Sequence, residues 1–242
     1  MTSENFRSWV SSKDHFVSTC DGGDLGTKET PSTWLMGVEP GWSLADQARE
    51  LANVAAPRTL DESYSVDLQL GWPFNRSAFK LLCALDGGSG EGYRDFAIRV
   101  RPFEKGSKGY FKANLFPVPL HTLAAWNEEA IRDTGFDTKS AYQAWLREAR
   151  FPVVTSHLEQ CRPKLLIGTG LSHLADFMAV VRAKTQQLHT ITVNGFDKRI
   201  YVATDGLLPL VVLPHLSGGS NGLNSNAAIE QAANLILDNV AL

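Results

Sequence analysis

Apolar and polar residues follow one another in blocks whose lengths distinguish strands from helices. Short, near-continuous apolar runs occupy residues 34–38 (WLMGV), 163–170 (PKLLIGTG) and 208–215 (LPLVVLPH). Runs of this kind, without polar alternation, are typical of parallel strands that are covered on both faces. The pattern therefore predicts buried parallel strands at all three places.

Segments with helical patterns separate these strands. The predicted helices are residues 44–55, 77–85, 171–181 and 224–242, together with the long stretch 122–161. Gly135 and Pro152 break that long stretch. Ser43 is placed to cap the helix 44–55, with Asp46 at the reciprocal position of a capping box.

Two further stretches, residues 95–103 (DFAIRVRPF) and 109–118 (GYFKANLFPV), are β-rich, and residues 189–204 predict a hairpin. Strands that alternate with helices indicate a parallel sheet with helices on both faces. We therefore expect residues 31–242 to form a single α/β domain, a three-layer α/β/α sandwich with a mostly parallel central sheet. Residues 1–30 are polar and turn-rich, and we interpret them as a loosely ordered arm or a helix packed outside.

Composition places the chain among ordinary globular proteins and narrows its partners. Of 242 residues, 43% are apolar and 20% are charged, and the formal net charge is −3. This balance gives no overall attraction to nucleic acid, so a phosphate-binding surface would have to be a local patch. No leader-like or bilayer-length apolar stretch is present, and we expect a cytoplasmic protein that does not enter the membrane.

The cysteines and histidines do not suggest a metal. Cys20, Cys83 and Cys161 lie far apart and are odd in number, which is typical of reduced thiols rather than of a disulfide framework. His157 and Cys161 are four residues apart on a predicted helix, but no third ligand is close in sequence. We therefore expect no metal site.

The first predicted strand ends in an unusual turn, GVEPG. Gly37 and Gly41 permit close approach of a ligand, Pro40 fixes the turn, and Glu39 is its one ionisable group. One interpretation is a plain turn with a solvated glutamate, which the segment on its own favours. The other is a catalytic carboxylate placed at a strand end.

Two residues in the middle of the chain have a structural and a functional interpretation. Phe74 follows Pro73 at the start of a helix, where it would either staple the helix or offer a ring for a stacked base, a contact worth about 1–3 kcal/mol. Asn114 interrupts an apolar strand and would either bond to backbone or be held for a ligand, since a buried amide needs partners. Its adjacent donor and acceptor suit the edge of a pyrimidine.

The last predicted strand is followed by a polar loop. His215 and Ser217 precede a stretch rich in glycine, serine and asparagine, which begins with Gly218. Such a loop can present backbone N–H groups and hydroxyls to a phosphate. A histidine is more often structural than catalytic, but its place at a strand end favours a functional role.

Taken in order, these segments resemble the motifs of the uracil-DNA glycosylase superfamily. In its iron–sulfur branch, a strand ending G-E-A-P-G precedes a P-F-x-G-x-A-G-x-L-L helix, an asparagine before a proline, a P-K-(apolar)-G strand and a strand ending in histidine. The corresponding pieces here are residues 37–41, 73–82, Asn114 with Pro117, residues 163–170 and His215. The segment His215-Leu216-Ser217 is similar to the H-P-S motif of the wider superfamily, and the resemblance runs from about Trp34 to the C-terminus.

The resemblance implies hydrolysis of the bond between a flipped pyrimidine and deoxyribose. Phe74 would stack on the base, Asn114 would read its Watson–Crick edge, and His215 would stabilise the departing base as negative charge develops. Glu39 would orient or activate water. The resemblance also implies that Gly37, Gly41, Ser217 and Gly218 contact DNA and its phosphates, and that the partner is DNA containing uracil or a damaged pyrimidine, bound by a monomer.

The chain departs from the family pattern in several ways. The cluster cysteines are missing, so we expect no iron–sulfur cluster and no other cofactor. Asn75 and Phe79 replace smaller residues, Leu216 stands where a proline is expected, and the gap from Gly41 to Pro73 is longer. Two alternatives therefore stay open: a non-catalytic protein that binds a nucleobase, nucleotide or nucleic acid on the same fold, and a structural α/β domain.

Overall fold

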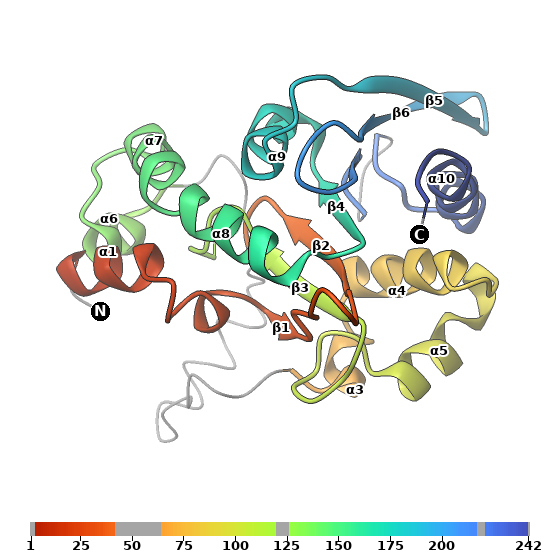
Figure 1. Cartoon of the computed structure of the whole chain (residues 1–242), viewed down its shortest axis with the longest axis horizontal. Helices are drawn as coiled ribbons and strands as arrows, with labels where there is room; N and C mark the ends of the chain where they lie inside the picture. Colours follow the sequence, from red (N-terminus) through yellow and green to blue (C-terminus); the bar gives the residue numbers. More distant parts are fainter. Residues whose placement is uncertain (1–2, 42–63, 120–125, 217–220, 242) are drawn as a thin grey trace.

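The computed structural model describes residues 3–41, 64–119, 126–216 and 221–241. This part of the chain is mixed α/β and contains a seven-stranded sheet in the order β1-β3-β2-β4-β7-β6-β5 (Figure 1). The strands are β1 (Gly22–Gly23), β2 (Thr33–Gly37), β3 (Tyr110–Asn114), β4 (Leu165–Thr169), β5 (Gln187–Val193), β6 (Phe196–Ala203) and β7 (Leu210–Leu213). The structure confirms the three predicted buried strands and the predicted hairpin of β5 and β6.

The four inner strands, β3, β2, β4 and β7, run parallel to one another. Gly37 pairs with Asn114, and Thr169 pairs with Leu213, so these strands end at nearly the same level. The outer strands β1, β6 and β5 pair antiparallel. The expectation of a mostly parallel central sheet is therefore confirmed for the inner strands, whose carboxyl ends lie along one edge.

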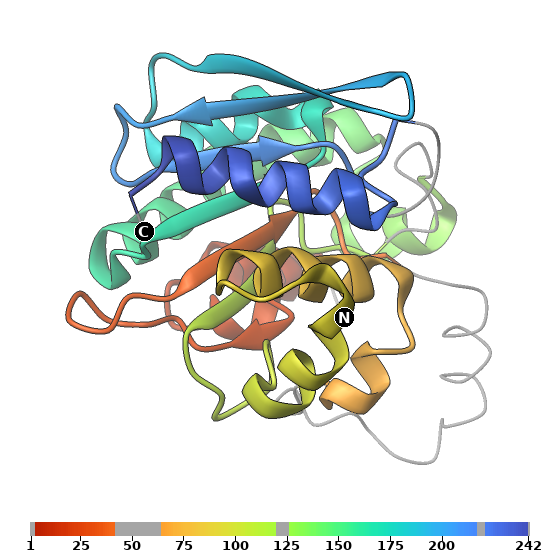
Figure 2. The same ribbon diagram turned by 90° about the vertical axis from the view of Figure 1, so that its right-hand side faces the viewer.

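Helices cover both faces of the sheet (Figures 1 and 2). They are α1 (Ser3–Ser11), α3 (Val66–Gln69), α4 (Pro73–Leu85), α5 (Tyr93–Val100), α6 (Glu128–Thr134), α7 (Lys139–Ala149), α8 (Phe151–Cys161), α9 (Leu174–Val181) and α10 (Asn226–Asn239), with short 3-10 turns at Val17–Thr19, Gly90–Gly92 and Leu171–His173. Gly135 ends α6 in a left-handed conformation and Pro152 lies in the first turn of α8, as the sequence predicts. The predicted helix 44–55 and its cap Ser43 lie outside the described residues.

Alternating side chains of the strands form two separate cores. Leu35 and Ile167 pack with α4, α5 and α10 in what we call the first core. Trp34 and Leu166 point to the opposite face and pack with α1, α7, α8 and α9 in the second core. Successive residues of a strand therefore point to opposite faces, so the position of a residue along its strand decides on which face its side chain lies at the sheet edge.

The prediction of β structure at residues 95–103 is wrong, because residues 93–100 form helix α5. Phe96, Ile98 and Val100 alternate with other residues, which gave the impression of a strand. In the structure Phe96 and Ala97 are buried together, whereas Ile98 is 57% exposed. Adjacent buried residues beside an exposed one fit the helical period, not the period of two.

The first thirty residues contribute to the core and to the sheet. Phe6, Val10 and Phe16 are buried in the second core. Strand β1 pairs antiparallel with β3, and Gly22 lies opposite Lys112. Gly23 has a φ of +105°, and a Cβ there would lie 2.3 Å from the Tyr110 carbonyl oxygen, so only glycine fits. The segment interpreted as an arm is thus the outermost layer of the second core and one edge of the sheet.

A buried arginine attaches this segment to the rest of the molecule. Arg150, at the junction of α7 and α8, has no exposed surface. Its guanidinium donates to the Leu115 carbonyl oxygen at 3.1 Å, to the Asn114 carbonyl oxygen at 3.3 Å and to the Thr19 hydroxyl at 2.6 Å. It also lies 5.7 Å from the ring centroid of Phe16. One side chain therefore joins the N-terminal segment to the end of β3.

We expect Arg150→Met to lower the free energy of unfolding by about 3 kcal/mol, because it leaves buried acceptors without donors. Urea unfolding measures this loss, and the exposed Arg199→Met is the control. Hydrogen exchange should show residues 3–23 losing protection first. A loss below about 1 kcal/mol, with unchanged protection, would show that the N-terminal segment is held by other contacts.

Candidate functional site

Hydrogen bonds beyond the strand ends hold the loops at the carboxyl edge. The Leu115 N–H donates to the Gly37 carbonyl at 3.0 Å, and the Phe116 N–H donates to the Val38 carbonyl at 2.9 Å. The Gly170 N–H donates to the Leu213 carbonyl at 2.9 Å. The segments after β2, β3 and β4 therefore leave the sheet at fixed positions, as ligand sites in parallel α/β sheets require.

On the side of the first core, the structure brings Phe74 and His215 together. Phe74 lies in the first turn of α4, where Pro73 begins the helix, and is half-buried against the first core. His215 follows β7 by two residues and is exposed, and its carbonyl accepts from the Leu223 N–H at 2.9 Å. The two ring centroids are 5.3 Å apart. An aromatic ring and an imidazole thus meet at the edge of the sheet.

Asn114 ends β3 on the same face and is 3% exposed. Its side-chain nitrogen donates to Asp21 Oδ2 at 2.7 Å. A Cβ on Gly37 would lie 2.4 Å from Asn114 Oδ1, so the amide occupies the space that any larger residue at position 37 would fill. Close packing against Asn114 explains the glycine at this position without any contact to DNA.

Two charged residues that the sequence analysis did not identify connect these groups. Lys112, two residues before Asn114 on β3, has Nζ 3.6 Å from Asp21 Oδ1 and 5.2 Å from the ring centroid of Phe74. Its ammonium also donates to Asn75 Oδ1 at 3.0 Å. Lys112 could have been identified from the sequence, because a lysine in an otherwise apolar strand needs a polar partner. Asp21 had no comparable signal in the sequence.

Glu39 has a different environment from the one expected. Its Oε2 lies 2.7 Å from Lys139 Nζ, and its Oε1 accepts from Gln143 at 3.5 Å; both partners belong to α7. The Glu39 side chain is 3% exposed, so it is not the solvated glutamate of a plain turn. Burial raises the pKa of Glu39, and the hydrogen bond and charge of Lys139 oppose this only in part. None of the residues around Phe74 is among the described partners of Glu39.

The remaining predicted site residues are divided between the described and undescribed parts of the chain. Apart from its own atoms and those of its chain neighbours, Gly41 has no described atom within 4 Å of a Cβ built on it. Ser217 and Gly218 lie outside the described residues. Of the two unusual residues of α4, Asn75 is the partner of Lys112, and Phe79 is buried with its ring 5.9 Å from that of Phe103. The structure thus brings Phe74, Asn114 and His215 to one face and joins Glu39 to α7.

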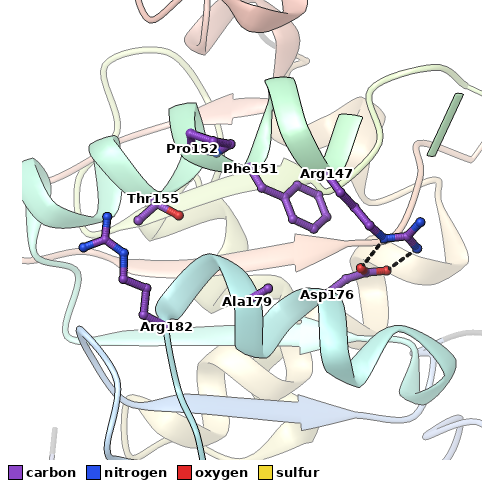
Figure 3. Close-up of a pocket in the computed structure, with 7 residues that line it drawn as sticks. All are labelled: Arg147, Phe151, Pro152, Thr155, Asp176, Ala179 and Arg182. Atoms are coloured by element: carbon purple, nitrogen blue, oxygen red, sulfur yellow. Dashed lines mark hydrogen bonds and ion pairs between the residues drawn. The ribbon is translucent and has the colours of Figure 1, made fainter. Parts of the chain in front are cut away.

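A second polar cluster lies near α7 and α9 on the side of the second core. Arg147 donates to both carboxylate oxygens of Asp176, at 2.7 and 3.0 Å, and His173 Nδ1 lies 2.8 Å from Asp176 Oδ2. Burial would raise the pKa of Asp176, but the hydrogen bonds from His173 and Arg147, with the charge of Arg147, lower it to about 2. This cluster borders a cavity of about 360 Å³ between α8 and α9, which Arg182 and Thr155 also line (Figure 3).

The described residues offer little for a metal, a disulfide or a membrane. They contain no group of three or more His, Cys, Asp or Glu side chains that could hold a metal ion. Cys20, Cys83 and Cys161 are free. None of the helices in the described ranges is long and apolar enough to cross a membrane.

Comparison of the sequence with protein-family models and with curated proteins gives no match. The functional assignment therefore rests on the residues at the carboxyl edge of the sheet. Among them, the group formed by Phe74, His215, Asn114, Lys112 and Asp21 combines an aromatic surface with oriented donors and acceptors.

We expect Gly37→Ala to displace the Asn114 side chain and lower the free energy of unfolding by about 1–3 kcal/mol, because the new methyl group overlaps the amide. Gly41→Ala is the matched control and should change stability by less than about 0.5 kcal/mol. Thermal unfolding and crystallography of both variants measure the effect. Equal stability of the two variants would contradict the packing role of Gly37.

We expect Asp176→Asn to lower stability at pH 7 by about 2 kcal/mol, since the folded protein holds the pKa of Asp176 near 2, below its ordinary value of 3.8. That contribution is present above pH 4 and is lost as the pH falls to about 2. Urea unfolding from pH 7 to pH 2 should therefore show the wild-type and variant curves converging at low pH. A constant separation down to pH 2 would exclude this titration as the cause.

Proposed function

We propose that this protein is a uracil-DNA glycosylase-like hydrolase with a three-layer fold of that superfamily. It would cleave the N-glycosidic bond of a flipped uracil, or a related damaged base, in DNA. The observation that carries the proposal is the contact of Phe74 with His215 at 5.3 Å, on the face that Asn114 also occupies. An aromatic ring, an amide and an imidazole on one face suit a pyrimidine held in a single orientation.

The proposed chemistry follows from these groups. A flipped base stacks on Phe74, and the amide of Asn114 reads its edge. The bond between C1′ of the sugar and N1 of the base breaks, and its electron pair leaves with the base. His215 donates a hydrogen bond to the base as that negative charge develops. The oxygen of a water molecule bonds to C1′, and the proton that this water loses passes through solvent to the departing base anion, which leaves as the neutral base.

The role of Glu39 as the group that activates this water meets a specific obstacle. Its carboxylate is in a close ion pair with Lys139 and is almost fully buried. To accept a proton from water, Glu39 would have to exchange Lys139 for a water molecule. Because the ammonium of Lys139 compensates the carboxylate, the ion pair has no net negative charge with which to stabilise a sugar with oxocarbenium character, and Glu39 could do so only after Lys139 moved away.

The same ion pair favours one alternative, a non-catalytic protein that binds a nucleobase or nucleotide on this fold. In that case Phe74, Asn114 and His215 would form the binding surface, and Glu39 would serve only to attach the turn after β2 to α7. The net charge of −3 also agrees with a ligand smaller than DNA.

Incubation of the protein with single- and double-stranded DNA that contains one uracil tests the proposal. We expect an abasic product, a loss of about a hundredfold in kcat for His215→Ala, and weaker substrate binding for Phe74→Ala. Phe196→Ala, at an exposed aromatic residue of β6, is the matched control. Glu39→Gln tests the role of Glu39. If Glu39 accepts the proton from water, the variant should lose most of its activity, and if Glu39 is only structural, the variant should keep it.

The outcomes distinguish the two functions. If the wild type binds deoxyuridine tightly but forms no abasic product, the result supports the binding protein and excludes the glycosylase. If the wild type neither cleaves uracil-containing DNA nor binds deoxyuridine, both assignments are wrong.

A further inference from the structure

Five polar side chains form one continuous chain from α3 to the carboxyl end of β3. They are Gln69, Asn75, Lys112, Asp21 and Asn114. Gln69, Asn75 and Asn114 are each 3% exposed or less, and the side chains of Lys112 and Asp21 are 11% and 17% exposed. Buried polar groups that are connected in this way restrict one another's orientation.

The orientation of the first two amides follows from their fixed partners. Gln69 Nε2 donates to the carbonyl oxygens of Tyr64, at 2.8 Å, and Pro102, at 3.3 Å. Carbonyls only accept, so the nitrogen of Gln69 must face them and its Oε1 must face Asn75. Asn75 Nδ2 therefore donates to that oxygen at 3.0 Å, and Asn75 Oδ1 is left to accept from Lys112.

The last two steps fix Asn114 in the same manner. Lys112 is a donor only, and it directs its ammonium to Asn75 Oδ1 at 3.0 Å and to Asp21 Oδ1 at 3.6 Å. The second oxygen of Asp21 then accepts from Asn114 Nδ2 at 2.7 Å. Because a carboxylate offers acceptors alone, it cannot face the oxygen of the Asn114 amide.

The consequence is a defined polarity at the proposed site. The nitrogen of the Asn114 amide is turned to Asp21, and its oxygen lies over Gly37. A base that meets this oxygen must offer it an N–H group. Uracil has such a donor at N3. Cytosine bound in the same orientation presents the lone pair of N3, which would repel the oxygen, because the donor of cytosine on this edge is its 4-amino group.

We propose that Asp21 is a positioning residue that fixes the Asn114 amide with its oxygen toward the ligand, so that the site selects uracil-type over cytosine-type pyrimidine edges. This inference rests on the proposed function, because it concerns which base the same site accepts. Asp21 lies more than ninety residues before Asn114 in the sequence, and it would affect specificity without touching the base.

Asp21→Asn tests this directly, since asparagine offers one acceptor where aspartate offers two. If its oxygen serves Lys112, its nitrogen faces Asn114, and the Asn114 amide must turn over to present its own oxygen. The amide nitrogen would then face the ligand and suit the lone pair of cytosine. Asp24→Asn is the matched control, because Asp24 accepts from the Gly26 and Gly109 N–H groups, at 3.1 and 2.9 Å, in the same segment.

The experiment measures the affinities of the full-length protein for deoxyuridine and deoxycytidine by calorimetry. The wild type and Asp24→Asn should prefer deoxyuridine by the same ratio, and Asp21→Asn should reduce that ratio by about tenfold or invert it. A ratio unchanged within about twofold in folded Asp21→Asn overturns the role of Asp21, while the proposed function stands. If the wild type cleaves uracil in DNA but binds neither nucleoside, the same ratio is taken from its kcat/KM on uracil- and cytosine-containing DNA. If it neither binds the nucleosides nor cleaves the DNA, the proposed function fails and the inference about selectivity fails with it.

If Asp21→Asn does not fold, side-chain NMR of the wild type tests the bond between Asn114 and Asp21 instead. One Nδ2 proton of Asn114, assigned by its loss in Asn114→Asp, should exchange with water far more slowly than those of the exposed Asn194. Equal exchange rates at the two residues would show that the bond to Asp21 does not hold the amide, and would overturn the inference.

Discussion

The arrangement of the proposed site depends on the buried guanidinium of Arg150. A charge removed from water is stable only when strong acceptors surround it, and the chain provides two carbonyls at the end of β3 and a hydroxyl of the N-terminal segment. The same contacts that satisfy this charge therefore bring residue 19 to the end of β3. Asp21 follows two residues later, so the burial of Arg150, together with the pairing of Gly22 to Lys112, places it beside Asn114.

The carboxyl edge of the sheet carries two chemically different groups because the sheet has two faces. Lys112 and Asn114 share the face of the first core with Phe74 and His215. Glu39, by residue parity, would be expected on that face too, but regular pairing ends at Gly37 and the chain bends at residues 38 and 39. The bend turns Glu39 to α7, where Lys139 compensates its charge. A change of direction over two residues separates the carboxylate from the aromatic pair.

Local patterns in the sequence were sufficient for much of the fold. The apolar runs identified β2, β4 and β7, because a strand covered on both faces needs apolar residues at every position. The same reasoning failed at residues 95–103, where chance alternation concealed the helical pair Phe96 and Ala97. Motif order indicated Phe74, Asn114 and His215 as candidates. Asp21, and Lys139 as the partner of Glu39, depend on contacts across ninety or more residues that no local pattern contains.

Strand β1 has a consequence for the way in which the molecule meets other copies of itself. An uncovered edge strand offers unpaired backbone groups with which another chain can pair, and natural sheets protect such edges with short strands. Gly22 and Gly23 cover one side of β3 in this way, and Asp21 directly precedes them. The residues that cover the edge of β3 and the residue that bonds the Asn114 amide are thus three consecutive positions. A substitution among residues 21–23 would therefore affect the edge of the sheet and the Asn114 amide together.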